Sequence, residues 1–374
     1  MLRHYFEILL SVVVLSVQLQ VIIICLCTSN ISYRTIVVAE QEGRPTEIDG
    51  MASPFVGVFA FGDSVLDTGN NNNLSSAAKC NFPPYGRDFI GGIPTGRFSN
   101  GKIYPDFIVE ALGIKHVLPA YLDPKLRSED LPTGVCFASG SSGYDPLTAS
   151  TVGVLTLSDQ LELFKDYRVK LIGLVGESIA KTIIANSLFL VSSGNNDIII
   201  TYPLLARKDE FHSYAALLVS FASTFLKDLY SIGARRIGIL NVAPLGCLPL
   251  ERNGGRLERV CLELQNQRAK MFNSQLSSEL DTINKDFPDA KLVLLDIYHP
   301  LLALNQHPQN SGFEVVKFGC RGSGTVEVTS FLCNPLSTST CSNASKYVYW
   351  DALHTTERAH RLIASQSFKL ITSI

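Results

Sequence analysis

The sequence predicts an α/β protein in which a mainly parallel, five-stranded central sheet lies between two layers of helices. The first observation is a series of five short apolar runs rich in β-branched residues, and the second is the helical periodicity of the segments between them. Short continuous apolar strands that alternate with helices are typical of a parallel sheet covered on both faces. Because parallel crossovers are right-handed, we expect a doubly wound, three-layer α/β/α arrangement.

The expected strands are the apolar runs, and the expected helices are segments with an apolar residue at every third or fourth position. In chain order the strands are Phe55–Phe61, Gly134–Ala138, Ser187–Ser192, Arg236–Asn241 and Lys291–Ile297. The clearest helical stripe consists of Phe211, Ala215, Leu218, Ala222, Phe225 and Leu229. An earlier helical stretch contains Leu155, Leu161 and Phe164, and a later one runs from Leu262 to Ile283.

Composition and charge narrow the classes of function. The chain has 374 residues, of which 46% are hydrophobic and 18% charged, so it can bury a sizeable core and is not expected to be disordered. Its net charge of −2 gives no reason to expect nucleic acid or an anionic membrane surface as a partner. Metal-ligand spacings and phosphate-cradling glycine loops are missing from the sequence, so we expect neither a metal nor a cofactor.

The N-terminus has the features of a targeting segment. Arg3 and His4 precede an apolar stretch from Ile8 to Cys27, which predicts a secretory signal. The stretch is long enough to serve as an uncleaved membrane anchor instead, but interspersed Ser and Gln residues favour cleavage. We therefore expect a secreted, extracellular protein without a stable membrane span, comprising a signal peptide (1–27), a flexible lead-in (28–52) and a single domain (53–374).

The cysteines and glycosylation sequons agree with export. Nine cysteines are present, and seven remain after removal of residues 1–27, so at least one thiol is free or paired between chains. Cys247 and Cys261 are the nearest candidates for a disulfide. Three sequons, at Asn30, Asn73 and Asn343, could carry glycans in an exported protein.

Small or polar clusters follow the first four expected strands. They are Ser64 after the first, residues 140–143 after the second, residues 194–197 after the third and residues 241–246 after the fourth. Parallel strands end at one rim of a sheet, and ligands bind beyond their carboxyl ends. Asp351 and His354 lie in the loop before the expected last helix, which can reach the same rim.

Ser64, Asp351 and His354 are the residue types of a nucleophilic hydrolase. Ser64 lies at a Gly-Asp-Ser turn where an apolar strand ends, and Asp351 precedes His354 by three residues. A serine is activated by a neighbouring imidazole that a carboxylate orients. The Gly-x-Ser-x-Gly elbow of α/β-hydrolases is absent from the sequence, so a serine hydrolase here would be of another kind.

At these residues the chain resembles the GDSL esterase/lipase family of plants, within the SGNH hydrolases, from about Phe55 to its C-terminus. Two further runs, at 143–148 and 157–164, resemble the extracellular-lipase branch of that family, known from pollen coats. The main motifs are Phe-Gly-Asp-Ser-x-x-Asp-Thr-Gly-Asn-Asn-Asn (61–72), Pro-Tyr-Gly-Arg-Asp-Phe (84–89), Thr-Gly-Arg-Phe-Ser-Asn-Gly-Lys (95–102), Ser-Gly-Asn-Asn-Asp (193–197), Pro-Leu-Gly-Cys-Leu-Pro (244–249) and Asp-x-x-His (351–354).

The resemblance implies a three-layer SGNH-hydrolase, flavodoxin-like fold and a role for each site residue. Ser64 would be the nucleophile, His354 its base and Asp351 the residue that orients the imidazole. The oxyanion hole would comprise the N–H of Ser64, the side-chain amide of Asn196, and a backbone N–H at Gly140–Ser141. Ser141 stands where the family usually has a second glycine, and Thr355 where it has proline, while Cys320–Arg321 replaces the usual pair of cysteines.

Three functions are consistent with this sequence. The first is a secreted serine carboxylic-ester hydrolase that acts on acyl lipids or small esters. The second is an acyltransferase that passes the acyl group from the same site to an alcohol. The third is a catalytically weak lipid-binding or coat protein on an esterase scaffold, which the unusual Ser141 keeps open.

Overall fold

A parallel sheet of four strands forms the centre of the structure. The computed structural model describes residues 53–205, 211–253, 258–327, 334–336 and 339–374. The strands lie in the order β1 (Val58–Gly62), β2 (Leu188–Ser192), β3 (Arg236–Leu240) and β4 (Lys291–Leu295). Their last residues are paired across the sheet, so all four strands end at the same rim. The α/β class and the mainly parallel sheet expected from the sequence are confirmed.

The fifth expected strand, Gly134–Ala138, is not a regular strand. It makes only isolated parallel bridges, from Cys136 to Ala60 of β1 and from Cys136 to Ala120. The N–H groups of Phe137 and Ala138 both donate to the Ala60 carbonyl, which interrupts the alternation that a longer ladder needs. If this segment is counted as the second strand along the chain, the spatial order of the five strands is 2-1-3-4-5, as in flavodoxin-like folds. Ligands of such folds bind where the strand order reverses, which here is between β1 and β2.

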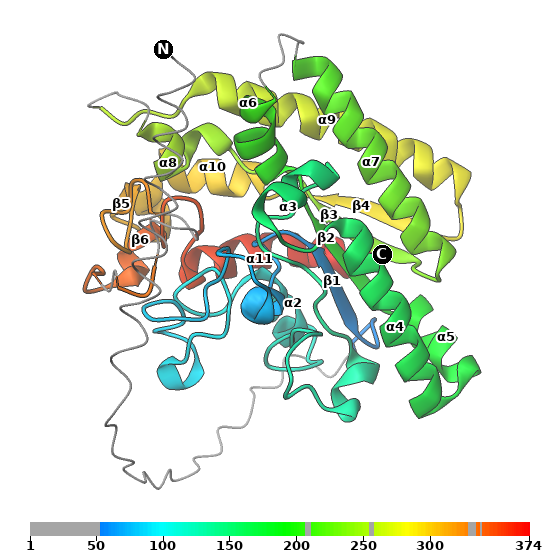
Figure 1. The fold of residues 1–374 in the computed structure, drawn as a ribbon. Coiled ribbons are helices and arrows are strands. Elements are labelled where there is room, and N and C mark those ends of the chain that lie inside the picture. The colour runs from blue at the N-terminus through cyan, green and yellow to red at the C-terminus, as the bar shows by residue number, and fades with distance from the viewer. Residues whose placement is uncertain (1–52, 206–210, 254–257, 328–333, 337–338) are drawn as a thin grey trace, which may run out of the picture. The chain divides into compact units, whose positions relative to one another are not determined.

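Helices cover both faces of the sheet. On one face α2 (Tyr104–Ala111) packs against α11 (Glu357–Ile371), and on the other α4 (Leu157–Val175) and α7 (Phe211–Ser231) pack together, with α9 (Glu263–Asp286) against α7 and β4 (Figure 1). The remaining α-helices are short: α3 (Pro146–Val152), α5 (Glu177–Ala185), α6 (Tyr202–Leu204), α8 (Pro249–Arg252) and α10 (Tyr298–Gln306).

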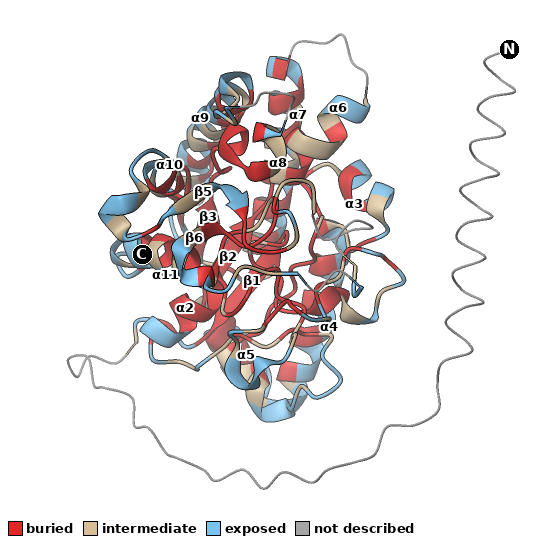
Figure 2. Ribbon diagram, turned by 90° about the vertical axis from the view of Figure 1, so that its left-hand side faces the viewer, coloured by how far each residue is buried: buried red, intermediate tan, exposed pale blue. Residues whose placement is uncertain are grey.

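Burial follows the predicted periodicities. All six residues of the apolar stripe on α7 are buried, which confirms the predicted core-facing helix. Strands β1 and β2 are buried at every position, as expected for a sheet covered on both faces (Figure 2). Among the described residues, no helix is both long and apolar enough to cross a membrane.

Short irregular helical turns connect these elements. The 3-10 turns are η1 (Asn70–Asn73), η2 (Ile90–Gly92), η3 (Ser128–Thr133), η5 (Leu245–Cys247), η6 (Pro308–Ser311) and η7 (Ala344–Lys346), and η4 (Asp197–Thr201) is a π-helical turn. Two of them, η4 and η5, directly follow the loops after β2 and β3, so they lie on the rim where the strands end.

A second, two-stranded parallel sheet of β5 (Val315–Gly319) and β6 (Tyr347–Tyr349) precedes the last helix and was not predicted. β6 is only three residues long, and β5 is partly exposed and interrupted by Lys317, so neither shows the long continuous apolar run of a buried strand. A disulfide between Cys320 and Cys341 joins the segments next to these strands.

The expected Cys247–Cys261 disulfide is confirmed. Cys136 forms no disulfide and is buried, with its thiol donating to the Leu66 carbonyl at 3.1 Å, so of the two expected possibilities, a free thiol or one paired between chains, Cys136 shows the first. The expected signal peptide (1–27), the lead-in (28–52) and the sequon at Asn30 lie outside the described residues.

Candidate active site

The site is built where β1 and β2 end, at the switch point of the sheet. The chain turns sharply after Gly62, whose φ of 120° favours glycine, and a side chain there would collide with the backbone of Ser192. The Gln160 side chain of α4 accepts from the Gly62 N–H (2.7 Å) and donates to its carbonyl (3.0 Å). This pair of hydrogen bonds fixes the end of β1 and so positions Ser64 two residues later.

Asp63 ties the loop after β1 to the loop after β2. Its carboxylate accepts from the Val65 N–H (3.0 Å), the Ser192 hydroxyl (3.1 Å) and the Asn195 amide (3.1 Å). Burial raises the pKa of Asp63, while these three hydrogen bonds act to lower it. These contacts give Asp63 a structural role, in which it steadies the Ser64 turn.

Ser64, His354 and Asp351 form a continuous hydrogen-bonded relay. His354 Nε2 lies 2.8 Å from Ser64 Oγ, and His354 Nδ1 lies 2.8 Å from Asp351 Oδ2. Asp351 is fully buried, and Ser64 is 9% exposed. The three residues predicted from the two ends of the chain therefore meet within hydrogen-bonding distance.

The Asp351 carboxylate is held as an anion by donors on both oxygens. Oδ1 accepts from the backbone N–H groups of Leu353 (2.8 Å) and His354 (2.7 Å), and Oδ2 accepts from the Tyr85 hydroxyl (2.7 Å). Burial acts to raise the pKa of Asp351, but the neighbouring His354 imidazole and the N–H donors outweigh it and lower the pKa below its usual value. Sequence reasoning missed Tyr85, although its motif Pro-Tyr-Gly-Arg was noted.

We expect Tyr85→Phe to lower kcat about tenfold with KM little changed, because Asp351 loses a charge-assisted hydrogen bond worth about 1.5–3 kcal/mol. Steady-state kinetics on a chromogenic ester and thermal unfolding would measure both effects. Tyr230→Phe is a matched control, since its hydroxyl bonds the exposed Asp289 on the surface. Equal losses of kcat in the two variants would contradict a positioning role for Tyr85.

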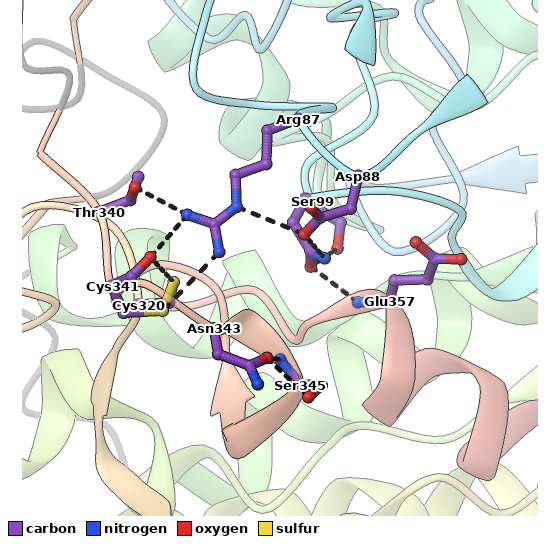
Figure 3. Close-up of polar contacts among 10 residues, drawn as sticks. Arg87, Asp88, Ser99, Cys320, Thr340, Cys341, Asn343, Ser345 and Glu357 are labelled. Atoms are coloured by element: carbon purple, nitrogen blue, oxygen red, sulfur yellow. Dashed lines mark hydrogen bonds and ion pairs between the residues drawn. A yellow bond between two sulfur atoms is a disulfide. The ribbon is translucent and has the colours of Figure 1, made fainter. Parts of the chain in front are cut away.

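The segment from Tyr85 to Asn100 also holds the chain on either side of Asp351–His354. Arg87 donates to the Thr340 hydroxyl (2.7 Å) and to the Cys341 carbonyl (2.8 Å), beside the Cys320–Cys341 disulfide (Figure 3). Asn100 accepts from the Glu357 N–H at the start of α11 (2.9 Å). The loop that carries Asp351 and His354 is thus anchored at both of its ends.

Three of the expected oxyanion donors keep an N–H group without a hydrogen-bond partner among the described residues. The backbone N–H groups of Ser64 and Ser141 make no hydrogen bond within the described parts of the chain. The Asn196 amide donates to the Ser142 carbonyl (2.9 Å), which uses one of its two N–H groups. The Gly140 N–H, by contrast, donates to Asp67 Oδ2 (2.8 Å), so of the two N–H groups at Gly140–Ser141 only that of Ser141 makes no hydrogen bond within the described residues.

Ser141 adopts the left-handed conformation expected of the glycine it replaces, with a φ of 70°. A non-glycine residue there costs on the order of 1 kcal/mol. The surrounding turn compensates by hydrogen bonds: the Ser139 N–H and the Ser142 hydroxyl both donate to the Gly62 carbonyl, at 2.9 and 2.8 Å. Ser141 is therefore held in this conformation from both sides.

A largely apolar cavity opens beside the relay. It is lined by Ser64, His354 and Asn196 and by side chains from the segments after β2, β3 and β4 and from α2 and α11. The volume of the cavity that is open to the centres of water molecules is about 80 Å³. This volume is several times the ~10–15 Å³ that one water needs. Among the described residues, no group of three or more His, Cys, Asp or Glu side chains could hold a metal ion.

This arrangement is the one that serine hydrolases use: a buried carboxylate, an imidazole and a serine hydroxyl are hydrogen-bonded in series, beside unpaired N–H groups, on an α/β sheet. The comparisons with known proteins narrow this class. Residues 58–367 match the GDSL-like lipase/acylhydrolase family. The chain belongs to this family and is a GDSL-type carboxylic ester hydrolase.

The similar proteins include several from Arabidopsis thaliana. GDSL esterase/lipase At5g42170 is 49% identical over 311 residues, which cover 83% of this chain and 84% of that protein. GDSL esterase/lipase EXL3 is 46% identical over 311 residues, covering 82% and 85%. GDSL esterase/lipase At3g14820 is 47% identical over 307 residues, covering 82% and 87%.

The two sequons within the described residues are accessible. Asn73 and Asn343 are both exposed. The Asn343 side-chain oxygen accepts from the backbone N–H of Ser345 (2.9 Å), which caps a short helical turn. Both positions can therefore accept a glycan without unfolding of the chain around them.

Proposed function

We propose that this protein is a secreted esterase that hydrolyses acyl lipids or small esters with Ser64 as the nucleophile. His354 takes the Ser64 proton as Oγ attacks the ester carbonyl, and Asp351 orients the imidazole and stabilises its positive charge. The proton then passes from His354 to the departing alcohol. Water, deprotonated by His354, attacks the acyl-enzyme, and the carboxylic acid leaves as Ser64 regains its proton.

The negative charge that develops on the carbonyl oxygen is bound by N–H donors. We assign these to the backbone of Ser64, the backbone of Ser141 and the Asn196 side chain. Such fixed donors stabilise the transition state more than the ground state, and each is worth about 3 kcal/mol. The observation that carries the proposal is the uninterrupted relay from Asp351 through His354 to Ser64, with both links at 2.8 Å.

Export is part of the proposal. The apolar N-terminal stretch over 8–27 has the sequence of a cleaved signal peptide. Two disulfides and two exposed sequons are compatible with an oxidising, extracellular compartment. We also assign the chain to the extracellular-lipase branch of the family, on the motifs at 143–148 and 157–164.

The direct test is hydrolysis of a short-chain chromogenic ester, such as 4-nitrophenyl butyrate, by the purified chain without residues 1–27. We expect steady release of nitrophenol with butyric acid as the main product. In the presence of added ethanol, the ratio of ethyl ester to acid measures how much acyl transfer accompanies hydrolysis. No turnover of any ester by the folded protein would refute the proposal.

We expect Ser141→Gly to raise kcat a few-fold with KM little changed, because relief of about 1 kcal/mol of backbone strain lets the donor align in the transition state. Ser141→Ala is the matched control, because it keeps Cβ and removes only the hydroxyl. It should behave as the wild type does. If kcat of Ser141→Gly is unchanged or lower, serine already fits this turn, and the strain is of no consequence for catalysis.

A further inference from the structure

The cavity beside Ser64 has a polar element that the proposed mechanism does not use. Most of its wall is apolar, contributed by Ile199, Leu248, Ile297, Leu301 and Ile363. Two polar side chains, Tyr104 of α2 and His360 of α11, also line it. They come from the two helices that pack against each other on one face of the sheet (Figure 1). An apolar pocket with a few placed polar groups is typical of a site that selects its ligand.

The His360 side chain has no hydrogen-bond partner in the described parts of the chain. Its residue is 6% exposed, and only its backbone N–H is bonded, to the Thr356 carbonyl within α11. Burial lowers the pKa of His360 to about 3, with the nearby His354 contributing in the same direction and Asp106 opposing. The ring is therefore neutral at ordinary pH and offers one N–H donor and one nitrogen acceptor.

Tyr104 contributes a second underused polar group. It is 1% exposed, and its hydroxyl makes no hydrogen bond of good geometry, although the Ser367 hydroxyl of α11 is near it. Leaving a buried polar group unpaired costs about 1–3 kcal/mol, so the His360 ring in this cavity calls for an explanation. A ligand that brings a hydrogen-bonding group to this part of the wall would supply the missing partner.

We propose that the acyl chain of the substrate occupies this cavity and that His360 hydrogen-bonds a hydroxyl group on the chain, so that the enzyme prefers hydroxylated acyl esters. This inference rests on the proposed function, since the acyl group must be attached to Ser64. A hydroxyl can donate to the unprotonated His360 nitrogen or accept from the ring N–H, whereas a plain alkyl chain leaves the ring unpaired. One recovered hydrogen bond corresponds to a preference of about threefold to tenfold in kcat/KM.

The experiment compares pairs of 4-nitrophenyl esters that differ only in a terminal hydroxyl, over chains of about six to twelve carbons. The measured quantity is the ratio of kcat/KM for the hydroxylated ester to that for the plain ester of the same length. Because His360 occupies a fixed place in the wall, the ratio should peak at one length. A general effect of the hydroxyl on solubility would appear at every length.

Variants separate His360 from the rest of the cavity. His360→Phe keeps a ring and removes both nitrogens, and we expect the peak in the ratio to disappear. His360→Gln keeps a donor and an acceptor and should retain the greater part of the peak. His212→Leu, at an exposed histidine on α7, is the control and should leave the ratio unchanged. Thermal unfolding of each variant verifies that it is folded.

Each outcome of this experiment either supports or overturns the proposed preference for hydroxylated acyl esters. A flat ratio in the wild type, or an identical peak in His360→Phe, overturns the inference and assigns only water to His360. Failure of the proposed function gives a different result, because the wild type would then hydrolyse no ester of either kind and Ser64 would not be labelled by a fluorophosphonate. Turnover of both esters with labelling of Ser64, but without a peak, refutes the hydroxyl preference alone.

Discussion

Ser64→Ala should lower kcat for ester hydrolysis by about four to six orders of magnitude, because no acyl-enzyme can form without the hydroxyl. The remaining activity would come from the oxyanion donors and from substrate binding, which the substitution leaves in place. Removal of one oxygen from a 9%-exposed side chain leaves no large cavity, so the thermal unfolding midpoint should change little.

Covalent labelling gives a second readout of the same substitution. A fluorophosphonate should label the wild type at one residue and fail to label Ser64→Ala. Ser178→Ala, at an exposed serine on α5, is a matched control that should be labelled and active like the wild type. Stoichiometric labelling of the Ser64→Ala variant would show that another residue is the nucleophile.

The substitutions His354→Ala and Asp351→Ala should each lower kcat by about three to six orders of magnitude, with the larger loss for His354. The double variant should be scarcely worse than His354→Ala, because Asp351 acts only through the imidazole that is then missing. Kinetics of the two single variants and the double variant measure this coupling directly. Losses that add in full would show that Asp351 acts independently of His354.

Two controls make this test sharper. Asp351→Asn keeps the size of the buried side chain and one of the two oxygens that accept from Leu353 and Tyr85, so it removes the charge with little loss of packing. His299→Ala removes a histidine that is likewise paired with the aspartate three residues before it, Asp296. This second pair lies on the surface of the protein. We expect no loss of kcat in His299→Ala, since nothing connects this pair to Ser64.

The fold and most of the candidate site could be predicted because their signals are local. The stripe on α7 and the apolar runs of β1 and β2 identify buried elements from periodicity alone. The run at 134–138 is equally apolar, yet it forms only isolated bridges through Cys136, because strand pairing depends on the partner's geometry as well as on the sequence of the run. The partly exposed β5 gives no such signal.

Residues that support the site were harder to predict because their roles depend on distant partners. Tyr85 lies 266 positions from Asp351, whose carboxylate it bonds, and Gln160 lies 98 positions from Gly62. Both fall within motifs that were noted for the family resemblance, but a motif does not name its contacts. The same holds for Asp67, which accepts the Gly140 N–H and thereby leaves Ser141 as the available donor.

By itself the sequence determined the α/β class, the Cys247–Cys261 bridge and the short-range geometry of the Asp-x-x-His turn, since three residues place Asp351 against the His354 backbone and ring. The same spacing occurs at Asp296 and His299, which form an equally close pair. The family motif favoured Asp351 and His354, and only the tertiary structure shows the physical difference between the two pairs. The order of strands brings the end of β1 to the loop before α11, so His354 meets Ser64 across 290 residues, while His299 remains in solvent.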